Sequence, residues 1–323
     1  MAQVIRLNEL LNDKLEYLWK SSGAWPEYQQ VMRLAFKNTF SDSIAHGQGS
    51  SHLSGLPGLC CQAAGGNPGW ASDLALAWLL AYSAAQLMDS VKDNDEPDAW
   101  WVNKGVGVAL SAATGLYFSA SLALNAALHH PATQECAAEI AGDFFKTFLV
   151  MGSGQYADLT SPSITLPEYW RQAETKSGAF FSLACRAGAR LATQEIGTIS
   201  EYSRFGSHLG LVIQISDDLD DVRPPQGSGS AGQKKPFARS LPAVFALDVL
   251  PHQKAEELRG YLQAAEHSTE AAHAAVSLID QCGAADYVLI EMERHKGEAL
   301  KALERANPLP PAGVALAKIL QEI

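Results

Sequence analysis

The sequence has few basic residues, and they are almost never adjacent. Its 24 Lys and Arg face 35 Asp and Glu, so the net charge is −11, and Lys234–Lys235 is the only place where two basic residues meet. Proteins that bind nucleic acid present basic patches or stripes that neutralise phosphates, and this chain has no such pattern. No nucleic-acid partner is expected.

Cysteine is also scarce and has no disulfide or metal-binding spacing. The cysteines are odd in number, no two form a C-x-x-C pair, and they are scattered: Cys60, Cys61, Cys136, Cys185 and Cys282. This pattern predicts reduced thiols in a cytoplasmic protein rather than a disulfide framework or a zinc site. The N-terminal segment, MAQVIRLNELLNDKLEYLWK, is charged and amphipathic, which is not the pattern of a signal peptide.

Strand-like alternation and fixed-period repeats are absent, whereas helical periodicity runs through most of the chain. The predicted helices lie at 3–20, 26–40, 57–64, from an N-cap at Ser72 to about 93, then at 103–129, 132–153, 166–195, 197–221, 240–249, 252–265, 268–281, 283–306 and 311–322. The segment GSGQYADL is expected to follow the helix that ends at 153. The sequence therefore predicts an all-α protein with one domain over residues 1–323.

One stretch has no charged residue for 24 positions, GVGVALSAATGLYFSASLALNAAL at 105–128. That is long enough to cross a bilayer. The segment is mostly Ala, Gly and Ser, however, and a helix that is apolar all round can equally lie at the centre of a large bundle. We expect a buried helix and no membrane span.

The richest acidic segment is LVIQISDDLDDVR at 211–223, where an apolar run leads into several carboxylates. On a helix, Asp217 and Asp221 lie on one face, with Gln214 a turn before them. Closely packed carboxylates repel one another, and a hard cation such as Mg²⁺ would offset that repulsion. A solvated acidic helix end is the alternative, although the apolar approach argues against it.

A second predicted helix, which begins near Ser72, also ends in carboxylates four residues apart, Asp89 and Asp93. Acidic residues at a helix C-terminus oppose the helix dipole, but alone they are common in solvent. Two long apolar helices that both end in this way suit an ion-binding opening at one end of a helical bundle.

Five segments, in this order, resemble the trans-isoprenyl diphosphate synthases (polyprenyl synthetases) and their class I terpene-synthase relatives. They are GSGQYADL (152–159), TKSGAFFSLACRAGA (175–189), LGLVIQISDDLDD (209–221), RSLPAVFAL (239–247) and GAADYVLIEMERHKGEAL (283–300). The resemblance extends from about residue 40 to the C-terminus. It implies an isoprenoid-synthase-type helical bundle around a central apolar cavity, and a homodimer in which 105–128 lies at the interface.

The resemblance also implies the roles of individual residues in binding Mg²⁺ (three ions) and a prenyl diphosphate substrate. The metal ligands would be Asp89, Asp93, Asp217, Asp218 and Asp221. The substrate-binding residues would be Gln155, Asp158, Lys176, Gln214, Lys234, Lys235 and Arg239, and the catalytic ones Lys176, Gln214, Asp217 and Asp89. Six aromatic residues are candidates to line the pocket for the allylic cation: Tyr82, Trp100, Tyr117, Phe118, Phe180 and Phe181.

The sequence departs from the family pattern at several positions that bind diphosphate or metal. The first motif reads Asp89-Ser90-Val91-Lys92-Asp93, so its second Asp is missing, and the Arg-Arg that usually follows is absent. The early basic element, expected within 47–58, contains neither Lys nor Arg. Where the family has a Lys shortly before a Leu-Pro pair, this chain has Ala238, and Arg239 follows it.

The missing cations would hold isopentenyl diphosphate in the family, and a second diphosphate would be poorly neutralised here. We therefore predict a terpene-synthase-like enzyme that ionises one prenyl diphosphate and cyclises it or quenches it with water. One alternative is a prenyltransferase that elongates a prenyl chain or uses another acceptor, such as a peptide or an aromatic. The other is a non-catalytic subunit of a prenyl diphosphate synthase.

Overall fold

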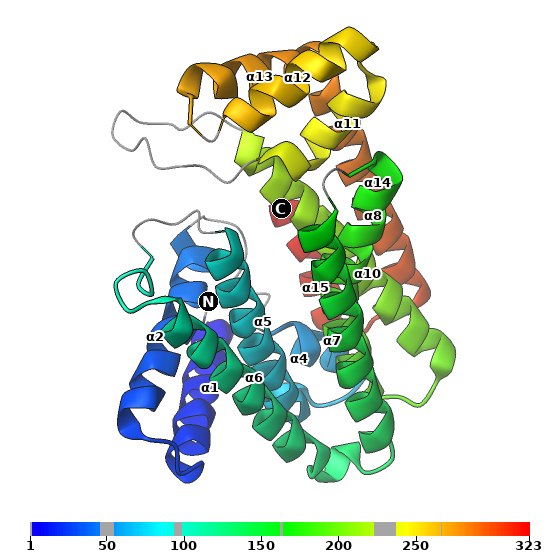
Figure 1. The fold of residues 1–323 in the computed structure, drawn as a ribbon. Helices are drawn as coiled ribbons and strands as arrows, with labels where there is room; N and C mark the ends of the chain where they lie inside the picture. Colours follow the sequence, from blue (N-terminus) through cyan, green and yellow to red (C-terminus); the bar gives the residue numbers. More distant parts are fainter. Residues whose placement is uncertain (1, 46–54, 94–98, 162–163, 223–236, 266) are drawn as a thin grey trace.

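In a computed structural model, the chain folds into a bundle of α-helices (Figure 1). The structure describes residues 2–45, 55–93, 99–161, 164–222, 237–265 and 267–323, and within these it places the backbone but not the side chains of 2–8, 39–45, 93, 221 and 237. No strand occurs in these described ranges. The prediction of an all-α fold is confirmed.

The helices follow the predicted order. They are α1 (Ala2–Ser21), α2 (Pro26–Ala45), α4 (Leu56–Ala63), α5 (Ser72–Asp93), α6 (Val106–Leu128), α7 (Ala137–Thr160), α8 (Leu166–Ala173), α9 (Ala179–Arg190), α10 (Ile196–Val222), α11 (Leu241–Val249), α12 (His252–Ala264), α13 (Thr269–Gln281), α14 (Ala284–Arg305) and α15 (Ala312–Glu322). Four short elements join them: the 3-10 turns η1 (Pro68–Ala71), η2 (Pro131–Thr133) and η4 (Phe237–Arg239), and the π-helical turn η3 (Glu174–Gly178).

Several predicted boundaries were wrong. α2 ends at Ala45 rather than at 40, and α7 begins at Ala137 rather than at 132. Ser72 is not an N-cap, because η1 runs directly into α5 and Ser72 has helical φ and ψ; Asn67 caps η1 instead by accepting from the Gly69 amide at 2.9 Å. The segment GSGQYADL does not follow a helix but forms the last turns of α7. The helix predicted over 166–195 is divided into α8 and α9 by the π-helical turn.

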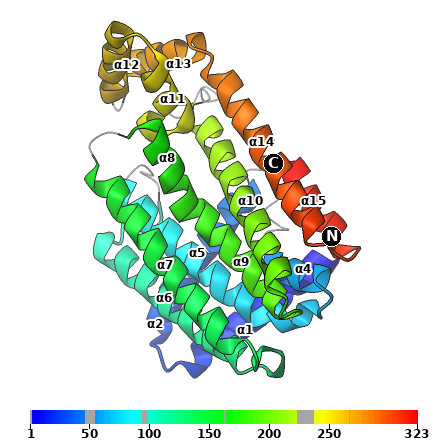
Figure 2. The ribbon, with the colours of Figure 1, turned by 90° about the vertical axis from the view of Figure 1, so that its right-hand side faces the viewer.

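The core of the bundle lies between α5, α6, α9, α10 and α14. In the views of Figures 1 and 2, α5 and α6 form an antiparallel pair, α10 packs between α9 and α14, and α11, α12 and α13 lie across one end. α5 is buried on almost every side, from Leu74 to Ala84, which suits a helix at the centre of a large core. A smaller apolar cluster holds α11, α12 and α13 together through residues such as Leu258 and Ile279.

Only one face of α6 is buried. Its alanines Ala109, Ala113 and Ala123 pack into the core, whereas Phe118 is 69% exposed. By length and composition alone, two helical stretches could cross a membrane: Pro68–Lys92, with 61% of its most apolar window buried, and Val106–Leu128, with 44%. The prediction of a buried helix at 105–128 was therefore only half right.

Close backbone contacts determine where α10 lies. A Cβ at Gly210 would overlap the carbonyl of Ser177 in η3, and a Cβ at Gly206 would lie too close to the carbonyl of Phe181 in α9. Gly154 in α7 lies close to a side chain instead, since a Cβ there would be 2.7 Å from Thr175 Oγ1. These glycines let α7, the π-helical turn and α10 approach closely, and this brings their side chains into one site.

Candidate functional site

The C-terminal ends of α5, α7 and α10 meet at the end of the bundle that faces α11, and the turns η3 and η4 complete the group (Figure 1). A continuous series of side-chain contacts connects them. Asp89 on α5 contacts Gln155 on α7, Lys176 in η3 contacts Asp158 on α7, and Ser177 in η3 contacts Gln214 on α10. The structure thus links the two acidic helix ends that the sequence predicted to face each other.

At the end of α5, the carboxylate Asp89 is bound by protein donors. Gln155 Nε2 donates to Asp89 Oδ1 at 2.8 Å, and Lys92 Nζ lies 3.6 Å from the same oxygen. Ser90, which stands where the family motif has its second Asp, accepts from the indole Nε1 of Trp101 at 3.1 Å. Among the described side chains, this end of α5 therefore combines one carboxylate, one hydroxyl and one ammonium.

Asp158 is the centre of the basic side of the site. Its Oδ2 lies 3.2 Å from Lys92 Nζ and 3.5 Å from Lys176 Nζ, and its Oδ1 lies 3.0 Å from Arg239 Nε. Burial by itself would raise the pKa of Asp158, but Lys176, Lys92 and Arg239 outweigh it and hold the pKa below its usual value. Arg239 also donates to the Ser161 carbonyl at 2.9 Å, which anchors η4 to the end of α7.

At the end of α10, the carboxylate Asp218 is only 5% exposed and is bound by neutral donors. It accepts from the Tyr169 hydroxyl at 2.6 Å, from the Leu241 amide at 2.6 Å and from Gln214 Nε2 at 2.9 Å. Burial raises the pKa of Tyr169, and Asp218 raises it further, so this hydroxyl remains protonated and can donate. Asp217, one position earlier, is exposed.

Local sequence explains how these donors are positioned. Thr165 and Glu168 form a capping box that starts α8, so that Tyr169 follows in the first turn and points to α10. Leu241 is the first residue of α11, where backbone amides have no partner within the helix and favour a negative charge. Asp218 therefore joins α8 and α11 to α10.

The π-helical turn η3 directs two neighbouring side chains, Lys176 and Ser177, toward different helices. Lys176 reaches Asp158 on α7, and Ser177 donates to Gln214 Oε1 on α10 at 2.8 Å. An inserted π-helical turn rotates the residues around it and is frequent at functional sites. Without it, one continuous helix would direct these residues differently.

The structure brings seven of the predicted site residues together: Asp89, Gln155, Asp158, Lys176, Gln214, Asp218 and Arg239. Asp217 lies at the same helix end. The side chains of Asp93 and Asp221, and all of Lys234 and Lys235, lie outside the described residues. Sequence reasoning missed Lys92, Tyr169 and Ser177; only Lys92 had a signal, since it lies one turn after Asp89.

Aromatic rings pack below the acidic end of α5. Phe180 stacks on Trp78 with ring centroids 4.5 Å apart and on Tyr82 at 5.6 Å. Burial raises the pKa of Tyr117, and the charge of Asp89 adds to the effect, which places this phenol near the site. Phe118 was predicted to line the pocket, but it is 69% exposed and faces away because α6 turns that side outward. The central apolar cavity remains a prediction.

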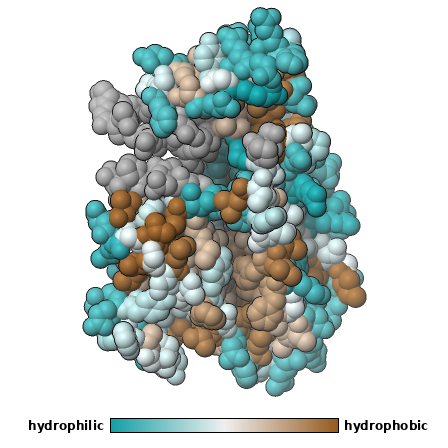
Figure 3. Space-filling model, viewed as in Figure 1, coloured by the Kyte–Doolittle hydropathy of each residue, from teal (hydrophilic) through white to brown (hydrophobic). Residues whose placement is uncertain are grey.

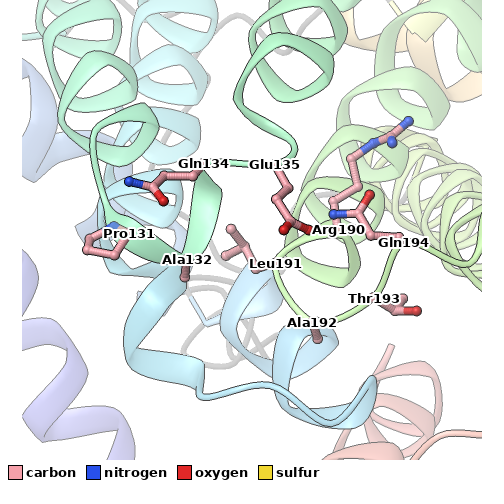
Figure 4. A pocket seen from close by; sticks show the side chains of 9 residues that line it. All are labelled: Pro131, Ala132, Gln134, Glu135, Arg190, Leu191, Ala192, Thr193 and Gln194. Atoms are coloured by element: carbon pink, nitrogen blue, oxygen red, sulfur yellow. The ribbon is translucent and has the colours of Figure 1, made fainter.

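A pocket of about 270 Å³ lies at the opposite end of the bundle, where η2 meets the end of α9 (Figure 4). Its lining is polar and small, with Gln134, Glu135 and Arg190 around Leu191. It contains none of the predicted site residues, so it is separate from the acidic helix ends.

The two acidic ends differ in how well they suit a divalent ion. Mg²⁺ takes oxygen ligands, usually one or two carboxylates with waters and substrate phosphates. Asp217 and Asp218 on α10 offer such oxygens, whereas Asp89 on α5 has Lys92 at ion-pair distance and Ser90 beside it. Among the described side chains, no group of three or more His, Cys, Asp or Glu could hold a metal ion by itself.

A protein-family model described as polyprenyl synthetase matches residues 61–279. A geranylgeranyl diphosphate synthase of Mycobacterium tuberculosis is 30% identical over 227 residues, 67% of this chain and 63% of that protein. The tryptophan prenyltransferase ComQ of Bacillus subtilis subsp. natto is 30% identical over 136 residues, 42% of this chain and 40% of that protein. The chain thus spans less than two thirds of the length of either relative.

Solved structures with the same fold cover almost the whole chain. The geranylgeranyl pyrophosphate synthetase of Pyrococcus horikoshii has a TM-score of 0.81 at 20% identity, over 99% of this chain and 96% of its own. The geranylgeranyl pyrophosphate synthase of Corynebacterium glutamicum, complexed with calcium and isoprenyl diphosphate, has a TM-score of 0.75 at 20% identity, over 99% and 95% of the two chains. The predicted isoprenoid-synthase-type bundle is confirmed.

Proposed function

This chain belongs to the polyprenyl synthetase family, and we propose that it is a magnesium-dependent prenyltransferase that ionises an allylic prenyl diphosphate. The observation that supports this most directly is the cluster of Lys176 and Arg239 on Asp158, next to the Asp217–Asp218 end of α10. It combines fixed cations for a diphosphate with carboxylates for a metal ion. Aromatic rings, among them Tyr82 and Phe180, pack below the end of α5.

The chemical step breaks a C–O bond, and the diphosphate that leaves gains negative charge as it does so. Lys176 and Arg239 offer cations to those oxygens, and groups that bind the leaving charge more strongly in the transition state accelerate the step. Mg²⁺ held at Asp217 and Asp218 would bind and polarise the same oxygens. Gln214 links Asp218 to Ser177 and so orients this side of the site.

The allylic cation that forms needs an apolar surrounding that excludes water. The stacked rings of Tyr82 and Phe180 lie below the end of α5 and can stabilise a cation over their faces. Tyr117 adds a third ring near Asp89. These three aromatic residues are the ones we assign to the prenyl-binding wall.

The terpene-synthase-like activity predicted from the sequence is not supported. The relatives found by sequence are prenyl diphosphate synthases and tryptophan prenyltransferases, all of which transfer a prenyl group to an acceptor. The prenyltransferase alternative therefore fits better. We propose isopentenyl diphosphate as the acceptor, as the synthases among the relatives suggest.

A second acceptor is favoured by one feature of the sequence. The segment 47–58 contains no Lys or Arg, so the cations that would hold a second diphosphate there are missing. An indole side chain needs no such cations, and tryptophan prenyltransferases are among the relatives. Prenyl transfer to the tryptophan of a peptide is therefore the second candidate.

Incubation with Mg²⁺ and geranyl, farnesyl or geranylgeranyl diphosphate tests the proposal. Each substrate is supplied alone, with isopentenyl diphosphate, or with a tryptophan-containing peptide. We expect a longer prenyl diphosphate only when isopentenyl diphosphate is present, whereas a prenylated peptide supports the second candidate. A Lys176→Met variant should lose the product, and a Lys254→Met variant, altered at an exposed residue of α12, should keep it. Hydrocarbon or alcohol from a single substrate would restore the terpene-synthase-like interpretation, and no product in any mixture favours the non-catalytic subunit.

We also propose that residues 1–323 act as one domain and that the protein is a cytoplasmic homodimer. Exposed apolar residues on α6 and α7 support the dimer: Leu110, Phe118, Leu122, Phe145 and Leu149. The space-filling view shows apolar side chains along this face, whereas α12 and α13 are mostly polar (Figure 3). Exposed apolar residues gathered on one side of a protein mark an interaction site. Sedimentation velocity of Phe118→Asp and Leu149→Asp variants should show a shift toward monomer.

A further inference from the structure

The π-helical turn η3 lies directly against the backbone of α10 at Gly210. A Cβ at Gly210 would overlap the Ser177 carbonyl oxygen, and it would lie 2.7 Å from the carbon of that carbonyl and 3.0 Å from the Gly178 nitrogen. All three atoms belong to the backbone, so none of them can move aside as the end of a flexible side chain could. The absence of a side chain at Gly210 therefore lets α10 and the turn lie this close together.

The bend at the turn has a local cause. The Ala179 amide reaches back five residues to the Glu174 carbonyl, which is the hydrogen bond of a π-helix. The Thr175 hydroxyl donates to the carbonyls of Arg171 at 2.9 Å and Gln172 at 3.0 Å, where α8 ends. A Thr hydroxyl that bonds one turn back often bends a helix. The shape of the turn thus comes from its own residues, whereas its position depends on the helix against which it packs.

The helices on both sides of the turn are anchored elsewhere. On α8, the Tyr169 hydroxyl donates to Asp218 of α10 at 2.6 Å. At the start of α9, the Phe180 carbonyl accepts from the indole of Trp78 on α5 at 3.0 Å. Because both neighbouring helices are held, a displacement at the turn is taken up mainly by residues 174–178.

The ammonium of Lys176 depends on the position of this turn. The Lys176 side chain passes Gly154 of α7, where a Cβ would be 3.2 Å from Lys176 Cγ, and its Nζ lies 3.5 Å from Asp158 Oδ2, one turn further along the same helix. When the backbone of the turn moves, this side chain moves with it. A misplacement of about 1 Å can remove most of the effect of a group that binds reacting atoms.

We propose that Gly210 is a positioning residue for Lys176: it lets the Ser177 carbonyl lie against α10 and so holds the turn where the ammonium can reach the diphosphate. The inference rests on the proposed function, since it assumes that Lys176 binds the leaving diphosphate. Gly210→Ala would push the turn away from α10 and displace Lys176 with it.

Gly206, one turn before Gly210 on the same helix, offers a matched control. A Cβ at Gly206 would be 2.5 Å from the Phe181 carbonyl oxygen, so Gly206→Ala crowds a backbone carbonyl of α9, beyond the turn. Calorimetric titration with inorganic pyrophosphate, without metal, compares the variants and needs no turnover. We expect Gly210→Ala to bind pyrophosphate about tenfold more weakly than wild type, because one charge-assisted contact is lost, and Gly206→Ala to bind as wild type does. Equal affinities in the two variants would overturn the inference, as would a wild type that does not bind pyrophosphate.

A double-mutant cycle tests whether Gly210 acts through Lys176. Lys176→Met alone should weaken pyrophosphate binding about tenfold. Adding Gly210→Ala to it should weaken binding no further, because the group that the substitution displaces is already absent. A second loss of the same size in the double variant would show that Gly210 acts in another way and would contradict the inference.

A milder change in the turn guards against poor folding of Gly210→Ala. Thr175→Val removes the hydroxyl that donates to the end of α8 and keeps the branched shape of the side chain. It should weaken pyrophosphate binding severalfold, and Thr175→Ser, which keeps a hydroxyl, should bind nearly as wild type does. Unchanged affinity in Thr175→Val would contradict a role for the turn in placing Lys176. A wild type that binds pyrophosphate more tightly than Gly210→Ala but forms no product would keep this inference and overturn the proposed function.

Discussion

The two acidic helix ends of this bundle look alike in sequence, yet the structure gives their carboxylates different partners. At the end of α5, Asp89 and its neighbour Asp158 are paired with Lys92, Lys176 and Arg239. At the end of α10, Asp218 is buried among neutral donors. The comparison teaches that similar acidic motifs can be bound in different ways, by cations at α5 and by hydrogen bonds from Tyr169, Gln214 and Leu241 at α10.

The same comparison separates two kinds of burial. A carboxylate with cationic partners can stay charged close to the surface, as Asp158 does. A carboxylate buried inside the protein needs several short hydrogen bonds, and Asp218 accepts three. We propose that the α5 side binds phosphate oxygens and that the α10 end binds a cation.

Asp218→Ala should have the largest effect, because it removes both a carboxylate that we propose binds the metal ion and the acceptor for three donors. The Tyr169 hydroxyl and the Leu241 amide would be left buried without their partner. We expect a loss of about 3 kcal/mol in the free energy of unfolding and a fall in turnover of at least about a hundredfold. Urea unfolding and product formation measure the two effects, and wild-type stability in this variant would contradict the role of Asp218 in joining α8 and α11 to α10.

Lys176→Met tests the basic side. The variant keeps the length of the side chain but removes a cation 3.5 Å from Asp158, so turnover should fall by about a hundredfold while the fold is retained. The ratio of kcat to KM with an allylic diphosphate measures the effect, and Lys254→Met is the control. Equal activity in the two variants would mean that Lys176 does not act on the leaving diphosphate.

Tyr169→Phe sharpens the comparison by removing one donor from the α10 end and leaving its charge in place. The hydroxyl donates to Asp218 Oδ2 at 2.6 Å. Its loss should cost about 1 kcal/mol of stability and lower turnover only severalfold, since Leu241 and Gln214 still donate. Urea midpoints of wild type and variant measure the change. A loss as large as that of Asp218→Ala would show that the hydroxyl alone holds the carboxylate.

The smallest expected effect is a pH dependence of the free energy of unfolding, caused by the ion pairs of Asp158. The pKa of Asp158 lies below its usual value of 3.8, so its ion pairs contribute stability above pH 3.8 and lose it as the pH falls through the lower folded value. Asp158→Asn should therefore lose less unfolding free energy than wild type between about pH 5 and about pH 2. Urea titrations at several pH values measure this, and parallel curves would contradict it.

Much of the fold was predictable because local sequence signals determine it. Helical periodicity marks the helices, and Gly, Pro and Ser mark the loops between them. The predicted helices from 241 to 322 agree with α11 to α15 to within two residues at their ends. The failures have specific causes. GSGQYADL looks like a loop because it holds two glycines, yet Gly154 is there to let α7 approach Thr175. The π-helical turn at 174–178 has no periodic signal that separates it from the helices on either side.

The site was predictable in its members but not in its pairings. Seven residues singled out by motif do lie together, whereas Tyr169, Ser177 and the role of Lys92 were missed. Tyr169 is 49 positions from Asp218, and the 18 positions between Lys176 and Asp158 include a change of helix. Partners at such separations leave no periodic trace in one sequence.

The order of residues along the chain determined by itself that this protein is helical, that two apolar helices end in carboxylates and that its motifs are those of one family. These properties depend on contacts within a few turns of helix, and local patterns report them. Only the tertiary structure decided which carboxylate meets a lysine and which meets a tyrosine. Charge balance at a site depends on side chains that distant segments bring within a few ångströms, and that distance is created by packing.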